Sequence, residues 1–174
     1  MEYDLVILAG GIGSRLNNVN KNKLPKPLIK FNNFHFLDYI LMKFSKFNFN
    51  KVYILTSYKG YMFKKYKSKF INFQNIEVIY EKKLMGTGGS LLKIKKKLNN
   101  NFLLINGDTY FDINIYKFIK DSKNKLCNIA LSNFDNYKSN NKLTYLDRDY
   151  KGKLYFNPKS KYFNGGIYFL NKKL

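Results

Sequence analysis

The chain has a single cysteine, Cys127, and a single histidine, His35, among its 174 residues. One thiol and one imidazole cannot make an internal disulfide or a zinc site of the Cys/His type, so any chemistry must come from lysine, arginine, carboxylate and backbone groups. Proline is scarce, with 3 residues, whereas hydrophobic residues make up 45% of the sequence. This composition is typical of a folded globular protein and excludes collagen-like and disordered chains.

The sequence also has no uninterrupted apolar run of about 18 residues, the minimum for a membrane-spanning helix. Its first residues include the acidic Glu2 and Asp4 where a signal peptide would have a basic segment. We therefore expect neither a membrane span nor a signal peptide, and a cytoplasmic protein. The length predicts one domain, residues 1–174.

Acidic residues are few: 11 against 32 basic ones, for a formal net charge of +21. Such a charge can indicate a nucleic acid or an anionic membrane as partner. Only Arg15 and Arg148 are arginines, and the lysines accompany many Asn, Ile, Phe and Tyr residues, whose codons are all rich in A and T. A biased genome explains this composition, so we expect no nucleic-acid and no membrane partner, and keep nucleic-acid binding as the least favoured alternative.

Apolar runs of strand length alternate with segments of helical apolar spacing through the first two thirds of the chain. This alternation predicts an α/β fold with a mostly parallel sheet. The expected order is strand 5–9, helix 36–47, strand 51–56, helix 59–69, strand 76–80, helix 86–98 and strand 101–105. From residue 126 onward, short strands at 126–132, 142–147, 152–156 and 166–170 are expected to extend the sheet and line one side of a cleft.

A glycine-rich loop, GGIGSR at residues 10–15, directly follows the first strand. Glycines let backbone N–H groups approach an anion closely, so the loop is predicted to bind phosphate. It matches neither the GxGxxG dinucleotide motif nor the GxxxxGK[ST] P-loop. A loop that only packs is the alternative, but Arg15 within the loop and Lys26 between two prolines in LPKPL favour phosphate binding.

The segments LAGGIGSRL, LPKPL, LMGTGGSL and LLINGDTYFDIN together resemble the sugar-phosphate nucleotidyltransferases, also called nucleoside-diphosphate-sugar pyrophosphorylases. The resemblance runs from Leu5 to about Asn171 and is closer over the first 115 residues. Within this family the chain is most similar to the D-glycero-D-manno-heptose 1-phosphate guanylyltransferase subgroup, on the basis of the motifs GTGGSL, NGDTYFD and FNGGIYFLNK. The resemblance implies a Rossmann-like three-layer α/β/α fold. It also implies transfer of a nucleotidyl group from a nucleoside triphosphate to a sugar 1-phosphate, with GTP as the favoured triphosphate and a heptose 1-phosphate as the favoured acceptor. Pyrophosphate is released, and the NDP-sugar feeds surface-polysaccharide synthesis.

By this resemblance Arg15 and Lys26 are the catalytic cations. The planar fork of Arg15 suits the leaving pyrophosphate, and the compact charge of Lys26 suits the α-phosphate and the attacking sugar phosphate. Surface charge is the alternative for both. Asp108 emerges after a central strand, where its carboxylate suits Mg²⁺, the expected cofactor. The alternative for Asp108 is a helix cap, but Asp112 is the better candidate for that cap.

The same resemblance gives the nucleotide-binding set, which comprises the two glycine-rich loops and one carboxylate: Leu8, Ala9, Gly10, Gly11, Gly13, Ser14, Glu81, Gly86 and Thr87. Guanine presents its N1–H and N2–H₂ donors side by side, and a carboxylate can accept both, so Glu81 favours GTP. A salt bridge from Glu81 to Lys82 or Lys83 explains this residue equally well.

The later part of the chain departs from the family pattern. Lys159, Asn164 and Gly165 are the predicted substrate-binding residues, but Pro158 stands where the family has a sugar-binding glutamate. The chain also stops at Leu174, before the family's second metal-binding aspartate. We therefore expect a nucleotide-binding half, 1–115, and a truncated sugar-binding half, 116–174, with exposed apolar surface and possible homo-oligomerisation. A catalytically inactive nucleotide-sugar-binding or regulatory remnant is the alternative function.

Overall fold

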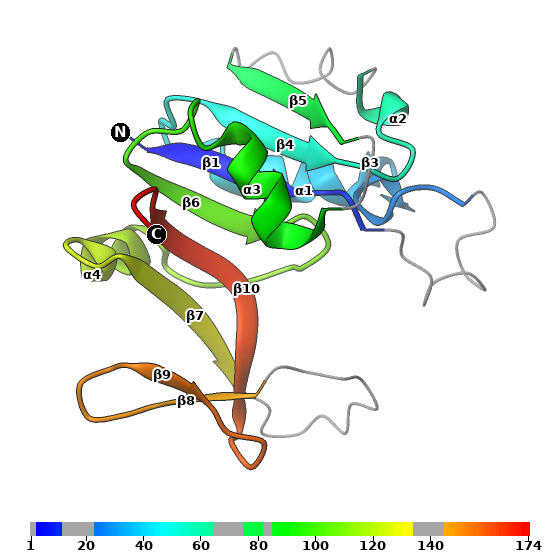
Figure 1. Ribbon diagram of the computed structural model, residues 1–174. Coiled ribbons are helices and arrows are strands. Elements are labelled where there is room, and N and C mark those ends of the chain that lie inside the picture. Colours follow the sequence, from blue (N-terminus) through cyan, green and yellow to red (C-terminus); the bar gives the residue numbers. More distant parts are fainter. Residues whose placement is uncertain (1–2, 12–22, 65–74, 82–84, 134–144) are drawn as a thin grey trace.

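The computed structural model describes residues 3–11, 23–64, 75–81, 85–133 and 145–174. Six strands of this part form a central sheet (Figure 1) in the order β5-β4-β1-β6-β10-β7. Their bounds are β5 Ile76–Tyr80, β4 Val52–Thr56, β1 Asp4–Leu8, β6 Asn101–Asn106, β10 Tyr162–Asn171 and β7 Cys127–Asn133. The first four strands of that order are parallel, and β10 is antiparallel to both β6 and β7. The predicted mostly parallel α/β class is thus confirmed.

Helices cover both faces of this sheet, because its central strands are apolar on both sides. In β1, Leu5 and Ile7 join the cluster beneath α1 (Phe36–Phe44), whereas Val6 joins the cluster beneath α3 (Gly86–Ile94). A continuous apolar run is the pattern of a parallel strand buried on both faces. The result is the three-layer α/β/α arrangement that the resemblance implied.

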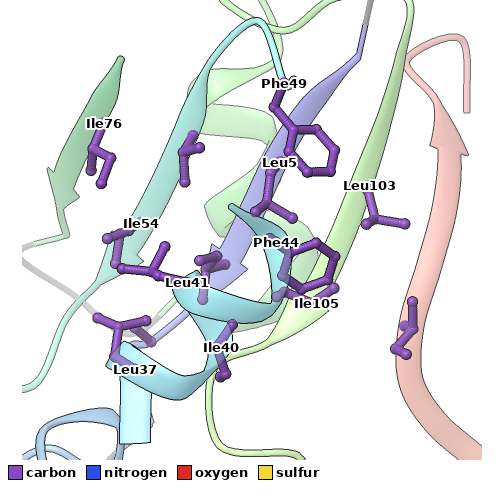
Figure 2. Close-up of a cluster of buried hydrophobic side chains, with 14 of the residues drawn as sticks. Leu5, Leu37, Ile40, Leu41, Phe44, Phe49, Ile54, Ile76, Leu103 and Ile105 are labelled. Carbon is purple, nitrogen blue, oxygen red and sulfur yellow. The ribbon is translucent and has the colours of Figure 1, made fainter. Parts of the chain in front are cut away.

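Helix α1 packs on the sheet through one apolar face. Leu37, Ile40, Leu41 and Phe44 are buried at the spacing of successive helical turns. Figure 2 shows these side chains facing residues of three neighbouring strands, β1, β4 and β6. Each such buried side chain contributes about 1.5–3 kcal/mol of hydrophobic stabilisation, so the α1 layer anchors the strands whose ends form the site.

The remaining helices are short. They are η2 Lys26–Leu28, α2 Tyr61–Lys64 and α4 Ile115–Ser122. Helix α2 covers part of the helix predicted at 59–69, whose remainder lies outside the described residues. Helix α3 ends at Ile94 instead of 98. Residues 95–98 form hydrogen-bonded turns in place of a last helical turn, and Leu98 is still buried. None of the described helices is long and apolar enough to cross a membrane.

Helix α4 is the helix that follows the turn after β6, and Asp112, the cap expected from the sequence, does not cap it. The N-cap is Asn114, whose Oδ1 accepts a hydrogen bond of 2.9 Å from the backbone N–H of Lys117. Asp112 instead pairs with Lys43 at 3.0 Å. The N-cap lies two residues later than expected, so Asp112 lies too far upstream to accept from the first N–H groups of the helix.

The prediction that all the late strands extend the sheet was wrong for two of them. β7 and β10 extend it, but β8 (Leu146–Arg148) and β9 (Leu154–Phe156) form a separate hairpin that projects from the sheet (Figure 1). The connecting turn is self-contained, because Asp149 accepts hydrogen bonds from the backbone N–H groups of Lys151 and Lys153. A second small pair, β2 (Lys30–Phe31) with β3 (Phe34–His35), precedes α1.

Candidate active site

A cavity of about 280 Å³ lies at the carboxyl ends of the parallel strands. It lies where β1 has β4 on one side and β6 on the other, the switch point at which open α/β sheets bind ligands. The lining residues come from six segments of the chain: Leu8, Ala9, Gly10, Gly11, Lys26, Pro27, Leu55, Glu81, Gly86, Thr87, Ser90, Asn106 and Asp108.

The start of the glycine-rich loop forms one wall of the cavity. The backbone N–H of Ala9 donates to the carbonyl of Leu55 at 2.8 Å, so the chain stays paired with β4 as it leaves β1. A Cβ on Gly10 would lie 3.3 Å from Ser57, whereas a Cβ on Gly11 would meet nothing within 4 Å. Gly11 thus leaves its backbone open to a ligand. The predicted residues Gly13, Ser14 and Arg15 lie outside the described residues.

Lys26 and Asp108, 82 residues apart in sequence, meet at the mouth of the cavity. The Nζ of Lys26 lies 2.9 Å from Oδ2 of Asp108. Pro27 occupies the first turn of η2, where a missing N–H costs nothing, and stiffens the backbone beside the lysine. Gly107 brings the other partner in: its N–H donates to the Leu8 carbonyl at 2.9 Å, and a Cβ there would lie 2.7 Å from that oxygen. Only a glycine lets the Asp108 turn lie so close to β1.

Glu81 is buried at the opposite side of the cavity, with 4% of its surface exposed. Its backbone N–H donates to the Thr56 carbonyl at 2.8 Å, which continues the pairing of β5 with β4. Its side-chain Oε1 is the one buried side-chain polar atom that lacks a hydrogen-bond partner in the described part of the chain. Buried acceptors without partners are costly and rare, so this atom indicates a donor on a ligand. Lys82 and Lys83, the alternative partners, lie outside the described residues.

The N-terminus of α3 closes the cavity beside Glu81. Gly86 adopts a positive φ of 69°, and the Oγ of Ser90 donates to its carbonyl at 2.9 Å. The N-cap, Met85, has no side-chain oxygen to accept the first N–H groups of the helix. These donors and the positive end of the helix dipole favour an acceptor group on a ligand near Thr87.

Three predicted substrate residues do not line this cavity. Lys159 lies in the exposed connection between β9 and β10. The side chain of Asn164 is hydrogen-bonded within β10, to Tyr168 and to the backbone of Gly166. Gly165 packs against β7, where a Cβ would lie 2.8 Å from the Ala130 carbonyl.

Several residues that line the cavity were not predicted from the sequence: Pro27, Leu55, Ser90 and Asn106. Asn106 is the most polar of them, and it directly ends the apolar run of β6. A polar side chain at the carboxyl end of a central strand was the available signal. Ser90, Leu55 and Pro27 gave no comparable signal, because their types fit ordinary packing.

The cavity offers few ligands for a metal ion. Asp108 and Glu81 are the two carboxylates that line the cavity, and the described residues contain no group of three or more potential metal ligands. Asp108 is partly exposed at the mouth, which fits an ion held by one carboxylate together with substrate phosphates and water.

The fold and the cavity are those of a nucleotide-binding α/β protein. The family model described as nucleotidyl transferase matches residues 5–146. The chain belongs to this family and is a nucleotidyltransferase, as the sequence analysis predicted.

Individual relatives agree with this assignment. The chain is 32% identical, over 97% of its length and 76% of the relative's, to the D-glycero-alpha-D-manno-heptose 1-phosphate guanylyltransferase of Campylobacter jejuni. It is 30% identical to the bifunctional protein GlmU of Methanocaldococcus jannaschii, over 98% of this chain and 40% of GlmU. Among solved structures, HddC from Yersinia pseudotuberculosis complexed with GMP-PN has a TM-score of 0.83 at 30% identity, over 98% of this chain and 77% of HddC.

Proposed function

We propose that the protein transfers a guanylyl group from GTP to a sugar 1-phosphate, with release of pyrophosphate and formation of a GDP-sugar. A heptose 1-phosphate is the proposed acceptor. The proposed role is to make, in the cytoplasm, the activated sugar that is used for surface-polysaccharide synthesis. The similarity to heptose 1-phosphate guanylyltransferases along nearly the whole chain supports this choice. In this proposal residues 1–115 bind mainly the nucleotide, and 116–174 contribute to the sugar side.

The observation that carries the choice of base is the buried carboxylate of Glu81, whose Oε1 has no hydrogen-bond partner among the described residues. Guanine offers N1–H and N2–H₂ as adjacent donors, which two carboxylate oxygens can accept together. Adenine, cytosine and uracil do not present two donors on one edge in this way. A site built to pair such donors rejects bases that leave its buried acceptor unpaired.

The cavity then orders the substrates along the sheet. In this proposal the base binds at Glu81, the triphosphate lies against Gly10 and Gly11, and its α-phosphate comes within reach of Lys26 of η2, all of which line the same cavity. The ammonium group of Lys26 neutralises charge on the phosphates as the sugar phosphate oxygen attacks and pyrophosphate leaves. Arg15 is proposed to bind the leaving pyrophosphate. Asp108 would hold Mg²⁺, which when bound supplies further charge neutralisation at the phosphates.

The test compares Glu81→Gln with Glu77→Gln. The glutamine amide keeps the shape of the Glu81 carboxylate, but its N–H₂ group is a donor and would face the N–H donors of guanine. We expect kcat/KM for GTP to fall at least about 10-fold and the preference for GTP over ATP, CTP and UTP to narrow. Pyrophosphate release with a panel of sugar 1-phosphates is the measurement. Glu77 is the matched control, because it lies on the same strand β5 but pairs with Lys51 and Lys97 outside the cavity.

Two results would contradict the proposal. An unchanged GTP preference in Glu81→Gln removes Glu81 from the base site. Binding of GTP by calorimetry, without release of pyrophosphate from GTP in the presence of any sugar 1-phosphate, rejects catalysis and supports the inactive binding module instead.

A further inference from the structure

Strand β10 has a bulge beside the cavity. Asn164 pairs with Leu131 of β7, and the next paired residue of β10 is Tyr168, with Ile129, so residues 165–167 stand opposite the single residue 130. On its other side, β10 pairs with β6 up to Ile167 and Ile105. The bulge therefore lies next to Asn106, the last residue of β6. Bulges of this kind often redirect a side chain next to an active site.

The two glycines of the bulge let its backbone pack directly against the Asn106 carboxamide. Gly166 has a positive φ of 75°, and a Cβ there would lie 2.7 Å from Nδ2 of Asn106 and 3.1 Å from its Cγ. A Cβ on Gly165 would lie 2.8 Å from the carbonyl of Ala130 in β7. No side chain other than hydrogen fits at either position without a shift, so the bulge limits where the Asn106 amide can lie.

Asn164 holds the bulge in this shape. Its Oδ1 accepts a hydrogen bond of 2.9 Å from the Gly166 N–H, and its Nδ2 donates to the Tyr168 hydroxyl at 2.8 Å. Both ends of the Asn164 amide are therefore engaged inside β10. Asn164 thus acts within β10, on the shape of the bulge.

Asn106 itself has free hydrogen-bonding capacity at the cavity. It lines the cavity with Asp108 and Lys26, and its carboxamide makes no hydrogen bond to the described residues. It offers one acceptor and two donors, the combination that suits sugar hydroxyls and phosphate oxygens. Three strand spacings separate β6 from β5 in the sheet order, about 14 Å, so Asn106 lies well away from the base site at Glu81.

We infer that Asn106 contacts the acceptor sugar 1-phosphate, and that Asn164 and Gly166 are positioning residues that aim its carboxamide. The inference rests on the proposed function, and it assigns the acceptor to the β6 and β10 side of the cavity. The predicted direct contact of Asn164 with substrate is replaced by this indirect role.

The experiment measures both substrates separately in Asn106→Ala. We expect the KM for D-glycero-α-D-manno-heptose 1-phosphate to rise at least about 10-fold, the loss expected when hydrogen bonds to a polar substrate are removed. The calorimetric Kd for GTP should stay within about two-fold of the parent value. Calorimetry with the heptose phosphate gives the same comparison without turnover.

Gly166→Ala tests the positioning role, with Gly152→Ala as its matched control. Gly152 also has a positive φ, 79°, but a Cβ there would meet nothing within 4 Å, in the turn of the β8–β9 hairpin. Both variants place a Cβ at a positive φ and so share that backbone strain, and Gly166→Ala adds the close contact with Asn106, so it should lower the melting temperature further than Gly152→Ala does. Only Gly166→Ala should raise the KM for the heptose phosphate. Asn164→Asp, which keeps the acceptor for the Gly166 N–H, should retain a lower KM than Asn164→Ala.

Three other outcomes would contradict the inference. An unchanged acceptor KM in Asn106→Ala overturns it, as does an equal loss of GTP and acceptor binding, which would show a general disturbance of the cavity. A parent protein that binds GTP but not the heptose phosphate also overturns it. Failure of the GTP proposal has a different signature, because it appears in Glu81→Gln and leaves the acceptor comparison intact.

Discussion

Lys26 and Asp108 carry the two opposite charges at the mouth of the cavity, and each neutralises the other before a ligand binds. A phosphate that enters beside Lys26 competes with Asp108 for the same ammonium group. Little further ordering of the Lys26 side chain is then needed, because its η2 backbone and Asp108 already hold it in place. The pair itself is partly exposed, and such pairs contribute at most about 1 kcal/mol to stability.

We therefore predict that Lys26→Ala lowers kcat by about two to three orders of magnitude, the usual loss when a group that stabilises developing charge is removed. The melting temperature should change little. Lys117→Ala, which removes a 2.9 Å surface pair with Asp121, is the control and should keep full activity. Turnover of Lys26→Ala within a few-fold of the parent would exclude a catalytic role. Arg15→Ala, a change outside the described residues, is expected to have a similar effect.

Asp108→Asn should abolish metal-dependent activity while it preserves the shape of the side chain, because a neutral amide is a poor ligand for a hard cation. The measurement is pyrophosphate release against Mg²⁺ concentration. Direct Mn²⁺ binding followed by paramagnetic resonance gives a second readout without turnover. Undiminished activity of this variant at limiting Mg²⁺ would remove Asp108 from the metal site.

At the scale of elements, the start of α4 shows how a helix boundary depends on one side chain. Both Asp112 and Asn114 are residue types that cap helices, and sequence alone favoured Asp112. The strand β6 and the turn after it set the point at which the chain meets the sheet again, through buried Phe111 and Ile115. That point places Asn114, and not Asp112, at the N-cap.

Asn114→Ala should destabilise the protein by about 1 kcal/mol, because it removes the acceptor for the Lys117 N–H. Asp112→Ala, the matched change at the cap expected from sequence, should cost less, since its exposed pair with Lys43 contributes little. Urea denaturation of the three proteins gives the comparison. A larger loss in Asp112→Ala than in Asn114→Ala would refute this assignment of the cap.

At the scale of the whole molecule, the formal net charge of +21 acts on folding and on binding in opposite ways. Like charges on a compact surface repel one another and destabilise the folded state, whereas the same field attracts an anionic nucleotide. Salt screens both effects, with a Debye length of about 10 Å at 0.1 M.

We predict that raising NaCl from about 0.05 to 0.5 M increases the melting temperature and weakens GTP binding in the same protein. Differential scanning fluorimetry and calorimetry along one salt series measure the two trends. A melting temperature that falls with salt would show that local ion pairs, such as those of Glu77 with Lys51 and Lys97, outweigh the general repulsion.

Much of the first half of the fold follows from local sequence. Strands β1 and β5 and helix α1 were predictable, because the spacing of the apolar residues in each segment indicates both its secondary structure and its buried face. The glycine-rich loop and Asp108 were identified for the same reason, as each directly follows a buried strand. The family was recognisable from these motifs, since backbone approach to phosphate requires glycine at particular positions.

The tertiary structure alone decided which distant residues meet. The 2.9 Å contact of Lys26 with Asp108 and the packing of Gly166 on Asn106 each join segments far apart in the chain. The burial of Glu81, with no partner for its Oε1 among the described residues, likewise depends on the elements packed around it. The pairing of β10 and β7 was also decided by the tertiary structure. The alternation of apolar and polar residues in these strands is equally compatible with pairing to the central sheet and with pairing to the β8–β9 hairpin. Strand pairing and register depend on the total burial gained by competing partners, and no local pattern contains that comparison.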